Sequence, residues 1–86
     1  MQRVTNIPHG TFTGRNMMTP DILGFYRVSI GAGFAYVELS TGSGFFGGEI
    51  FGVTVRRAGG ERLDPDPSGC YESKADALEA IKKLEQ

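Results

Sequence analysis

Residues 71–86, YESKADALEAIKKLEQ, decide the fold of this chain, because their apolar residues recur with the period of an α-helix. The apolar stripe consists of Ala77, Leu78, Ile81 and Leu84. Ser73 is a good N-cap residue, and Asp76 follows it three positions later, as in a capping box. The pattern predicts an amphipathic helix over residues 73–86. A helix this short is marginal alone, so we expect it to pack on another element.

The residues before the helix change to the period-two alternation of β-strands. We expect three main strands, a short strand and a final edge pair at residues 24–30, 34–40, 46–57, 61–63 and 70–71. The face expected to pack on the helix consists of Tyr26, Val28, Val37, Leu39, Val53 and Val55. The predicted fold class is α+β: an antiparallel sheet of three to four strands with one C-terminal helix packed on one face.

The register of the first two strands follows from which residues would face each other. A four-residue loop at residues 31–34 pairs Val28 with Val37 and sets Arg27 opposite Glu38. A loop one residue shorter places apolar residues opposite polar ones. We therefore predict the four-residue loop and an Arg27–Glu38 cross-strand pair.

Length limits the chain to one domain, because 86 residues cannot bury two cores. We expect an irregular N-terminal arm over residues 1–20, with a short strand over residues 10–13, and a single α+β domain over residues 21–86. Two alternatives are open for the arm: a poorly ordered leader, or a segment that packs on a partner subunit. Cys70 is the only cysteine, so no intramolecular disulfide can staple the small core. Oligomerisation is a common way to enlarge such a core.

Charge and hydropathy exclude several classes of partner. The formal net charge is −1, which is no basic footprint for nucleic acid. Residues 73–75 are similar to the helix start of the double-stranded RNA-binding domain, but Ala75 stands where that motif has a second cationic residue. No stretch approaches the roughly 18 apolar residues of a membrane span, and no signal peptide is seen. We expect a cytoplasmic protein that binds neither nucleic acid nor membranes.

The motifs that can carry chemistry do not meet their structural context. Gly42, Gly44 and Gly47 spell G-x-G-x-x-G, but a strand is expected next instead of the helix that a dinucleotide site needs. We interpret the motif as a hairpin loop, and the glycine pair at residues 47–48 as a bulge or bend. His9 is the only histidine and has no partner pattern around it. No catalytic residue, metal site or cofactor is predicted, and the chain is not expected to be an enzyme.

The sheet face away from the helix carries the candidate sites, because one helix can cover only one face. The interface candidates there are Phe25, Phe34, Tyr36 and Ile50. A cluster of exposed aromatic residues usually marks an interface or a ligand groove. The alternative is that the arm folds back over these residues. Candidate ligand or anion contacts are Phe45, Phe46, Arg56, Arg57 and Arg62, with Phe34 and Tyr36 completing an aromatic groove.

The second half of the chain resembles one repeat of the YegP-like family of small bacterial proteins. The resemblance rests on residues 37–40, 51–55, 60–61 and 71–75, with Ala77 and Ile81. It implies a homodimer or tandem repeat that joins sheets, with no established activity. We therefore predict a small non-enzymatic protein-interaction module, a homodimer or a partner of another protein, of bacterial, phage or mobile-element origin. The alternative is a small-ligand-binding protein that uses an aromatic groove on the sheet.

Overall fold

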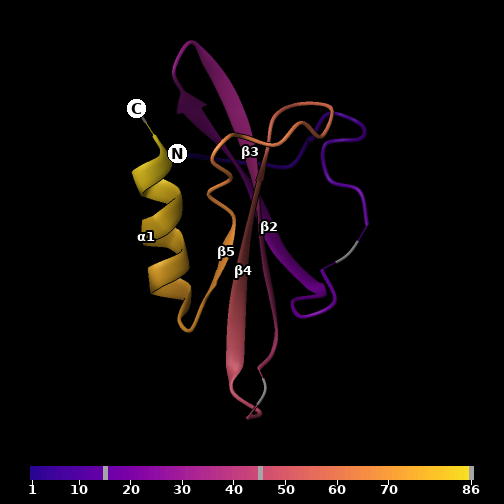
Figure 1. Cartoon of the computed structure of the whole chain (residues 1–86), viewed down its shortest axis with the longest axis vertical. Helices are drawn as coiled ribbons and strands as arrows, with labels where there is room; N and C mark the ends of the chain where they lie inside the picture. The colour runs from indigo at the N-terminus through magenta and orange to yellow at the C-terminus, as the bar shows by residue number, and fades with distance from the viewer. Residues whose placement is uncertain (15, 45, 86) are drawn as a thin grey trace.

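The computed structural model describes residues 1–14, 16–44 and 46–85, and it shows a sheet with one helix packed against it (Figure 1). Within these residues the antiparallel sheet has five strands in the order β1-β2-β3-β4-β5. The elements are β1 (Gln2–Val4), β2 (Asp21–Ile30), β3 (Gly33–Ser43), β4 (Glu49–Arg56), β5 (Gly69–Tyr71) and α1 (Lys74–Leu84). The α+β class is confirmed, while the predicted three to four strands are too few.

β1 is the strand that the sequence pattern missed. The strand predicted over residues 10–13 is wrong, because Gly10 and Gly14 take positive φ angles of +82° and +79°, which break an extended run. The first residues of the chain pair with β2 instead. Arg3 holds them there, since its Nη2 donates to the Leu23 carbonyl over 3.1 Å. The arm, as the structure defines it, is therefore residues 5–20.

The turn between β2 and β3 has two residues, not the predicted four. Its first residue, Gly31, has a φ of +58°, as a type II′ hairpin turn requires. The shorter turn moves the register by two residues, so each side chain keeps its face but changes its neighbour. Arg27 lies opposite Tyr36, and Glu38 lies opposite Phe25. The predicted Arg27–Glu38 pair is therefore wrong.

β3 runs longer, and β4 begins later, than the pattern predicts. Residues 41–43, which the alternation leaves between strands, continue β3, and the turn lies at residues 44–48. The bulge or bend predicted at residues 47–48 is a bend in the turn before β4, where Gly47 has a φ of +80°. The register irregularity lies in β2, between Ile22 and Gly24.

The segment between β4 and the helix contributes one edge strand. The edge pair predicted at residues 70–71 is confirmed as part of β5, which pairs with β4. The strand predicted over residues 61–63 is wrong. The chain leaves the sheet there through a tight turn, in which the Arg57 N–H donates to the Glu61 carbonyl over 2.7 Å and the Gly60 N–H donates to the Arg57 carbonyl over 3.0 Å.

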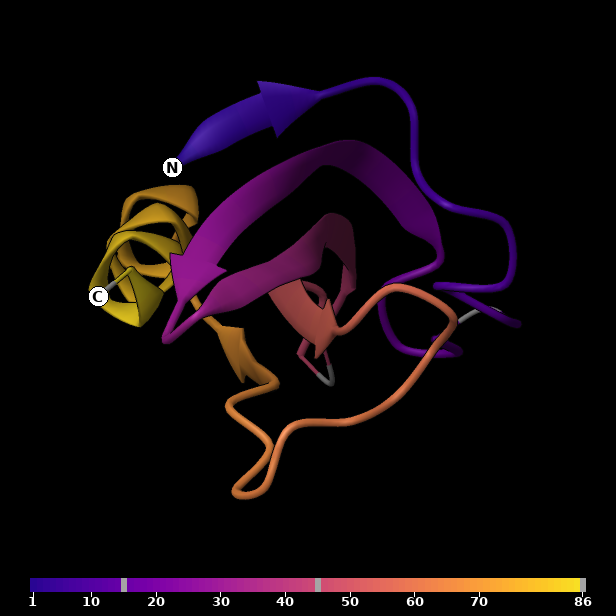
Figure 2. The same cartoon turned by 90° about the horizontal axis from the view of Figure 1, so that it is seen from above.

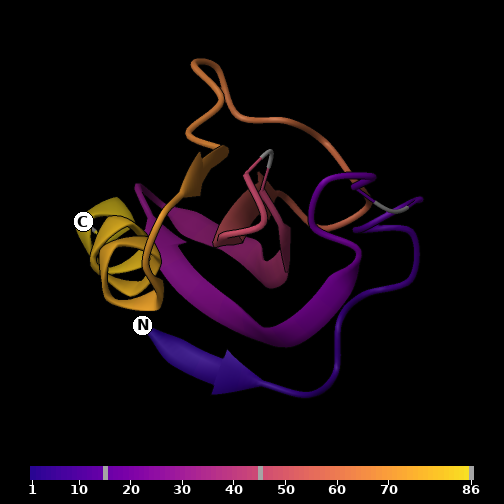
Figure 3. The same cartoon turned by 90° about the horizontal axis from the view of Figure 1, so that it is seen from below.

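α1 packs on the inner face of the sheet, the face that the alternation predicts. The predicted cap is confirmed, since the Ser73 Oγ accepts the Asp76 N–H over 3.1 Å. Seen along the long axis, the helix lies on one side of the curled sheet and the arm on the other (Figures 2 and 3). The buried core consists of Tyr26, Val28, Ala35, Val37, Leu39, Phe51, Val53, Val55, Ala77 and Ile81. All six predicted inner-face residues are in it.

Candidate functional site

The four interface candidates lie along the outer face of the sheet but do not form one patch. Phe34 lies beside the β2–β3 turn, whereas Ile50 pairs with Gly42 near the other end of β3. Eight residues of strand separate Phe34 from Gly42, which corresponds to roughly 27 Å. Tyr36 lies next to Phe34 on this face, and Phe25 lies between the two ends. The outer face therefore has to be considered in parts.

The part near the β2–β3 turn combines an exposed ring with a cation. The side chain of Phe34 is 52% exposed. The Arg27 guanidinium carbon lies 4.7 Å from the centroid of this ring, a cation–π contact. Arg27 also donates to the Gln2 Oε1 over 2.8 Å, which ties this end of the face to β1.

The middle of the outer face is covered by the chain's own arm. Phe12 of the arm packs on Phe25 with ring centroids 5.7 Å apart and planes inclined at 35°. Thr11 holds this part of the arm in place. Its hydroxyl donates to the Pro8 carbonyl over 2.7 Å and accepts the Gly59 N–H over 3.3 Å. The arm thus folds back over Phe25, as one of the alternatives from the sequence supposes.

A second anchor holds the end of the arm over β3 and β4. Thr19 is only 2% exposed, and its Oγ1 accepts a hydrogen bond from the Ser40 Oγ over 2.9 Å. The threonine lies directly on Gly52 of β4, where an added Cβ would come within 2.6 Å of the Thr19 Oγ1. A glycine in the middle of a strand often marks such a close approach. Gly52 is therefore the sequence signal that could have located this contact.

Where it crosses the outer face, on both sides of Thr11, the arm leaves a cleft, which we call the arm cleft. It consists of two adjoining hollows of about 310 Å³ and about 470 Å³. The smaller hollow, the polar lobe, is lined by Thr13, Asn16, Thr54, Arg56, Gly60 and Arg62. The larger hollow, the apolar lobe, is lined by Ile7, Pro8, His9, Gly10, Ile22 and Phe25. Both lobes share Thr11, Phe12, Gly14 and Glu38.

Glu38 lies where the two lobes meet. Its side chain is half-buried between Phe25 on β2 and Thr54 on β4. Burial raises the pKa of the Glu38 carboxyl above its ordinary value, because water is partly excluded from the charged form. No other described residue donates a hydrogen bond to the carboxyl or forms an ion pair with it. The sequence pattern missed this residue because the predicted register gave it Arg27 as a partner.

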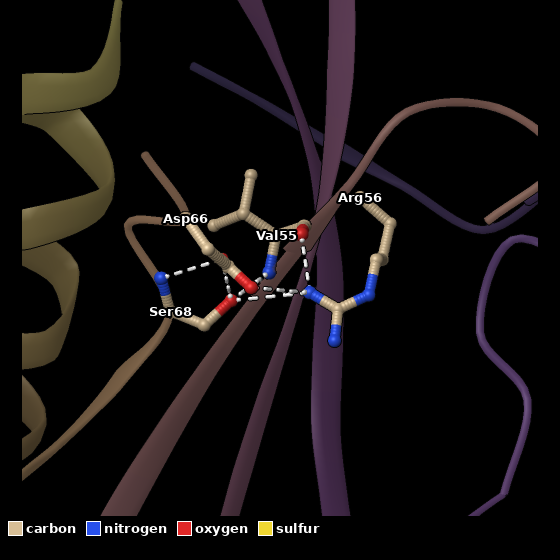
Figure 4. Close-up of polar contacts among 4 residues, drawn as sticks. All are labelled: Val55, Arg56, Asp66 and Ser68. Atoms are coloured by element: carbon tan, nitrogen blue, oxygen red, sulfur yellow. Dashed lines mark hydrogen bonds and ion pairs between the residues drawn. The ribbon is translucent and has the colours of Figure 1, made fainter. Parts of the chain in front are cut away.

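Arg56 is turned toward the loop after β4 (Figure 4). Its Nη1 donates to the Asp66 Oδ2 over 3.3 Å, to the Ser68 Oγ over 3.3 Å and to the Val55 carbonyl over 2.7 Å. The pKa of Asp66 lies below its ordinary value, mainly because the Ser68 hydroxyl donates to its carboxylate. The Ser68 N–H and the charges of Arg56 and Arg62 lower this pKa further. The positive charge beside the polar lobe therefore acts on Asp66.

The remaining candidate contacts are spread over the molecule. Arg62 lines the polar lobe with Arg56, and it also lines a separate hollow with Arg57, Ile30 and Lys83. Neither hollow is lined by all three arginines. Phe46 follows the far end of β3 from Phe34, so these two rings do not line one groove. Phe45 lies outside the described residues.

The remaining sequence motifs lie in a turn and at the edge of the sheet. The G-x-G-x-x-G motif runs from the end of β3 into the turn before β4, so the hairpin interpretation is confirmed. Cys70 is exposed on β5. In residues 1–14, 16–44 and 46–85, no group of three or more His, Cys, Asp or Glu residues is placed to hold a metal ion. No helix in the same residues has the length and apolar composition needed to cross a membrane.

Comparison with known proteins finds no relative from which a function can be transferred. No family model matches the chain, and no curated protein and no solved structure matches it. The resemblance of the second half to the YegP-like family stays a prediction. The function therefore has to be argued from the geometry of the surface.

Proposed function

We propose that this chain is a small non-enzymatic protein-interaction module that works as a homodimer. The observation that carries the proposal is an apolar cluster where the arm enters β2. We call it the methionine end, and it consists of Met17, Met18, Ile22 and Leu23. Met17 is 93% exposed, Met18 51% and Ile22 52%. Single exposed apolar residues are common, whereas a cluster of them usually marks an interaction surface.

The backbone places two of these residues, Met18 and Ile22, on the same stretch of β3. A Cβ on Gly42 would come within 2.0 Å of the Met18 carbonyl oxygen, so the arm lies directly on β3 there. Ile22 pairs with Ser40, two residues from Gly42 on the same strand. Methionine side chains adapt to irregular contact surfaces, which suits them to an interface between proteins.

Charge and size favour a second copy as the occupant. The net charge of −1 gives two copies little mutual repulsion. A standard interface buries about 800 Å² per partner, and the total accessible surface of 5558 Å² leaves ample area for one. The small core is the kind that oligomerisation commonly extends. The YegP-like resemblance, with its implied homodimer, supports the same reading and the proposed bacterial, phage or mobile-element origin in a cytoplasmic setting.

The sheet edges are less suited to self-association than the methionine end. β1 and β5 have three residues each, and short edge strands are a common protection against pairing with another chain. Beyond β5, the Val55 N–H of β4 is already bonded to the Ser68 Oγ over 3.0 Å. We therefore propose the dimer through side chains of the methionine end.

Light scattering after gel filtration tests this proposal. The wild-type chain is expected at twice the monomer mass of 9.3 kDa at high micromolar concentration. Met17→Glu is expected to give a monomer, because it places a charge at the centre of the proposed contact. Phe34→Glu is the matched control at the other end of the outer face and is expected to stay dimeric. A monomeric wild type, or dissociation by Phe34→Glu alone, would overturn the proposed surface.

A further inference from the structure

We propose that the arm cleft binds a small organic amine, whose ammonium group pairs with Glu38 and whose apolar body occupies the apolar lobe. This role is separate from the proposed dimer. It rests on the groups that surround the cleft, of which Ile22 alone also belongs to the methionine end.

The first support is the carboxyl of Glu38, which is half-buried and receives no hydrogen bond from the other described residues. A partly buried charge is costly unless donors compensate it. An ammonium group carries a full positive charge and up to three N–H donors, so it suits a carboxylate that lacks partners. The carboxyl faces the hollow of the cleft, where a ligand can reach it.

The second support is the chemistry of the apolar lobe beside Glu38. Its apolar lining comes from Ile7, Pro8, Phe12, Ile22 and Phe25. The faces of Phe12 and Phe25 attract a nearby cation, and their edges pack against an apolar body. Its volume of about 470 Å³ lies within the ordinary size range of small-molecule sites. The lobe is thus an apolar binding site directly next to the anionic Glu38.

The third support is that no described charge of the neighbouring polar lobe contributes to the pKa of Glu38, which is raised by burial. The Arg56 Nη1 donates hydrogen bonds to Asp66, Ser68 and the Val55 carbonyl. The charge of Arg62 also lowers the pKa of Asp66. The Glu38 carboxylate is therefore left as the group that selects the ligand. It favours an amine over the acid of the same shape, which it would repel.

The test is a titration followed by amide chemical shifts in nuclear magnetic resonance spectra. The probes are phenethylamine, 2-phenylethanol and 3-phenylpropionate, which share an aromatic body and differ in the polar group. Phenethylamine is expected to shift the amides of Phe12, Phe25 and Glu38. The alcohol and the acid are expected to bind at least tenfold more weakly, since they lack the charge-assisted hydrogen bond.

Variants locate the site and separate it from the dimer. Glu38→Gln is expected to weaken phenethylamine binding about tenfold while it keeps the dispersed spectrum of a folded chain. Glu79→Gln, on the exposed side of α1, is the matched control and is expected to bind like the wild type. Met17→Glu is also expected to bind the amine, so a failed dimer does not hide a working cleft. Absent shifts at millimolar amine, equal binding of the alcohol, or unchanged binding in Glu38→Gln would each overturn the proposal.

Discussion

The apolar stripe of α1 packs against the inner face of the sheet, whereas the irregular arm lies on the outer face. The helix touches its face with residues such as Ala77 and Ile81, which are fully buried in one apolar core. The arm touches its face mainly at Phe12, Thr11 and Thr19. The helix thus packs a continuous apolar stripe on its face, while the arm, which is held at single contacts, leaves the arm cleft beside it.

The difference assigns stability and binding to opposite faces. Burial of apolar surface is the dominant favourable term in folding, and nearly all of it is on the inner face. The outer face instead holds a half-buried carboxyl, the side chains of Arg27, Arg56 and Arg62, and exposed apolar residues. Such groups contribute little to stability and are the usual material of interaction sites. Three substitutions test this division.

The largest effect is expected from Leu39→Ala on the inner face. Leu39 is almost completely buried, and truncating a core leucine costs about 2–5 kcal/mol. That is close to the whole stability of a domain of this size, so the variant is expected to be largely unfolded at room temperature. Urea denaturation followed by circular dichroism measures the change. Phe34→Ala, half exposed on the outer face and away from the methionine end, is the matched control and should change stability by about 1 kcal/mol or less. Similar losses in both variants would contradict the assignment of stability to the inner face.

A smaller effect is expected from Gly52→Ala, which acts on the arm. The new Cβ would collide with the Thr19 Oγ1 and the Ser40 Oγ, so the end of the arm has to move. Overpacking of this kind costs about 1–3 kcal/mol. Hydrogen exchange is expected to speed up in the arm and to stay slow in α1. Gly48→Ala is the matched control, because a Cβ there meets nothing within 4 Å. Unchanged exchange in the arm of Gly52→Ala would show that Thr19 does not lie on β4.

The smallest effect is expected from Glu38→Gln, and its sign depends on pH. The pKa of Glu38 is raised by burial in the folded chain, so the wild type loses stability as pH rises from the ordinary pKa of a glutamate to this raised value. The glutamine variant does not ionise, and it is expected to be slightly more stable than the wild type at neutral pH. Below about pH 4 the carboxyl is protonated in both states and the difference should nearly vanish. Thermal melts over this pH range measure it. A wild type that is more stable at neutral pH would mean that Glu38 has a charged partner.

The inner face could be predicted from the sequence because its signals are periodic. Alternation along the strands places Val37 and Val53 in the core, and the stripe of α1 does the same for Ile81. Ser73 is recognised as a cap because its hydroxyl satisfies a free N–H at the helix start. The edge pair predicted at residues 70–71, after the proline-rich loop, is part of β5.

The outer face could not be predicted as far, for two physical reasons. A shift of two residues in a hairpin leaves every face unchanged, so the pattern cannot tell a two-residue turn from a four-residue one. That shift replaces Arg27 with Phe25 as the neighbour of Glu38, so that no described residue forms an ion pair with the carboxyl of the cleft. The arm has no period at all, and its position depends on single contacts such as that of Thr19 with Ser40. The signals that remain are single glycines that the arm approaches closely, such as Gly42 and Gly52.

The central claim is that the arm folds over the outer face and forms the cleft, and nuclear Overhauser effects in solution test it most directly. The ring centroids of Phe12 and Phe25 lie 5.7 Å apart. Cross-peaks between the protons of these two rings are therefore expected, alongside cross-peaks between α1 and the inner face. Cross-peaks from α1 without any between Phe12 and Phe25 would show a covered inner face and an open outer face, and would contradict the account.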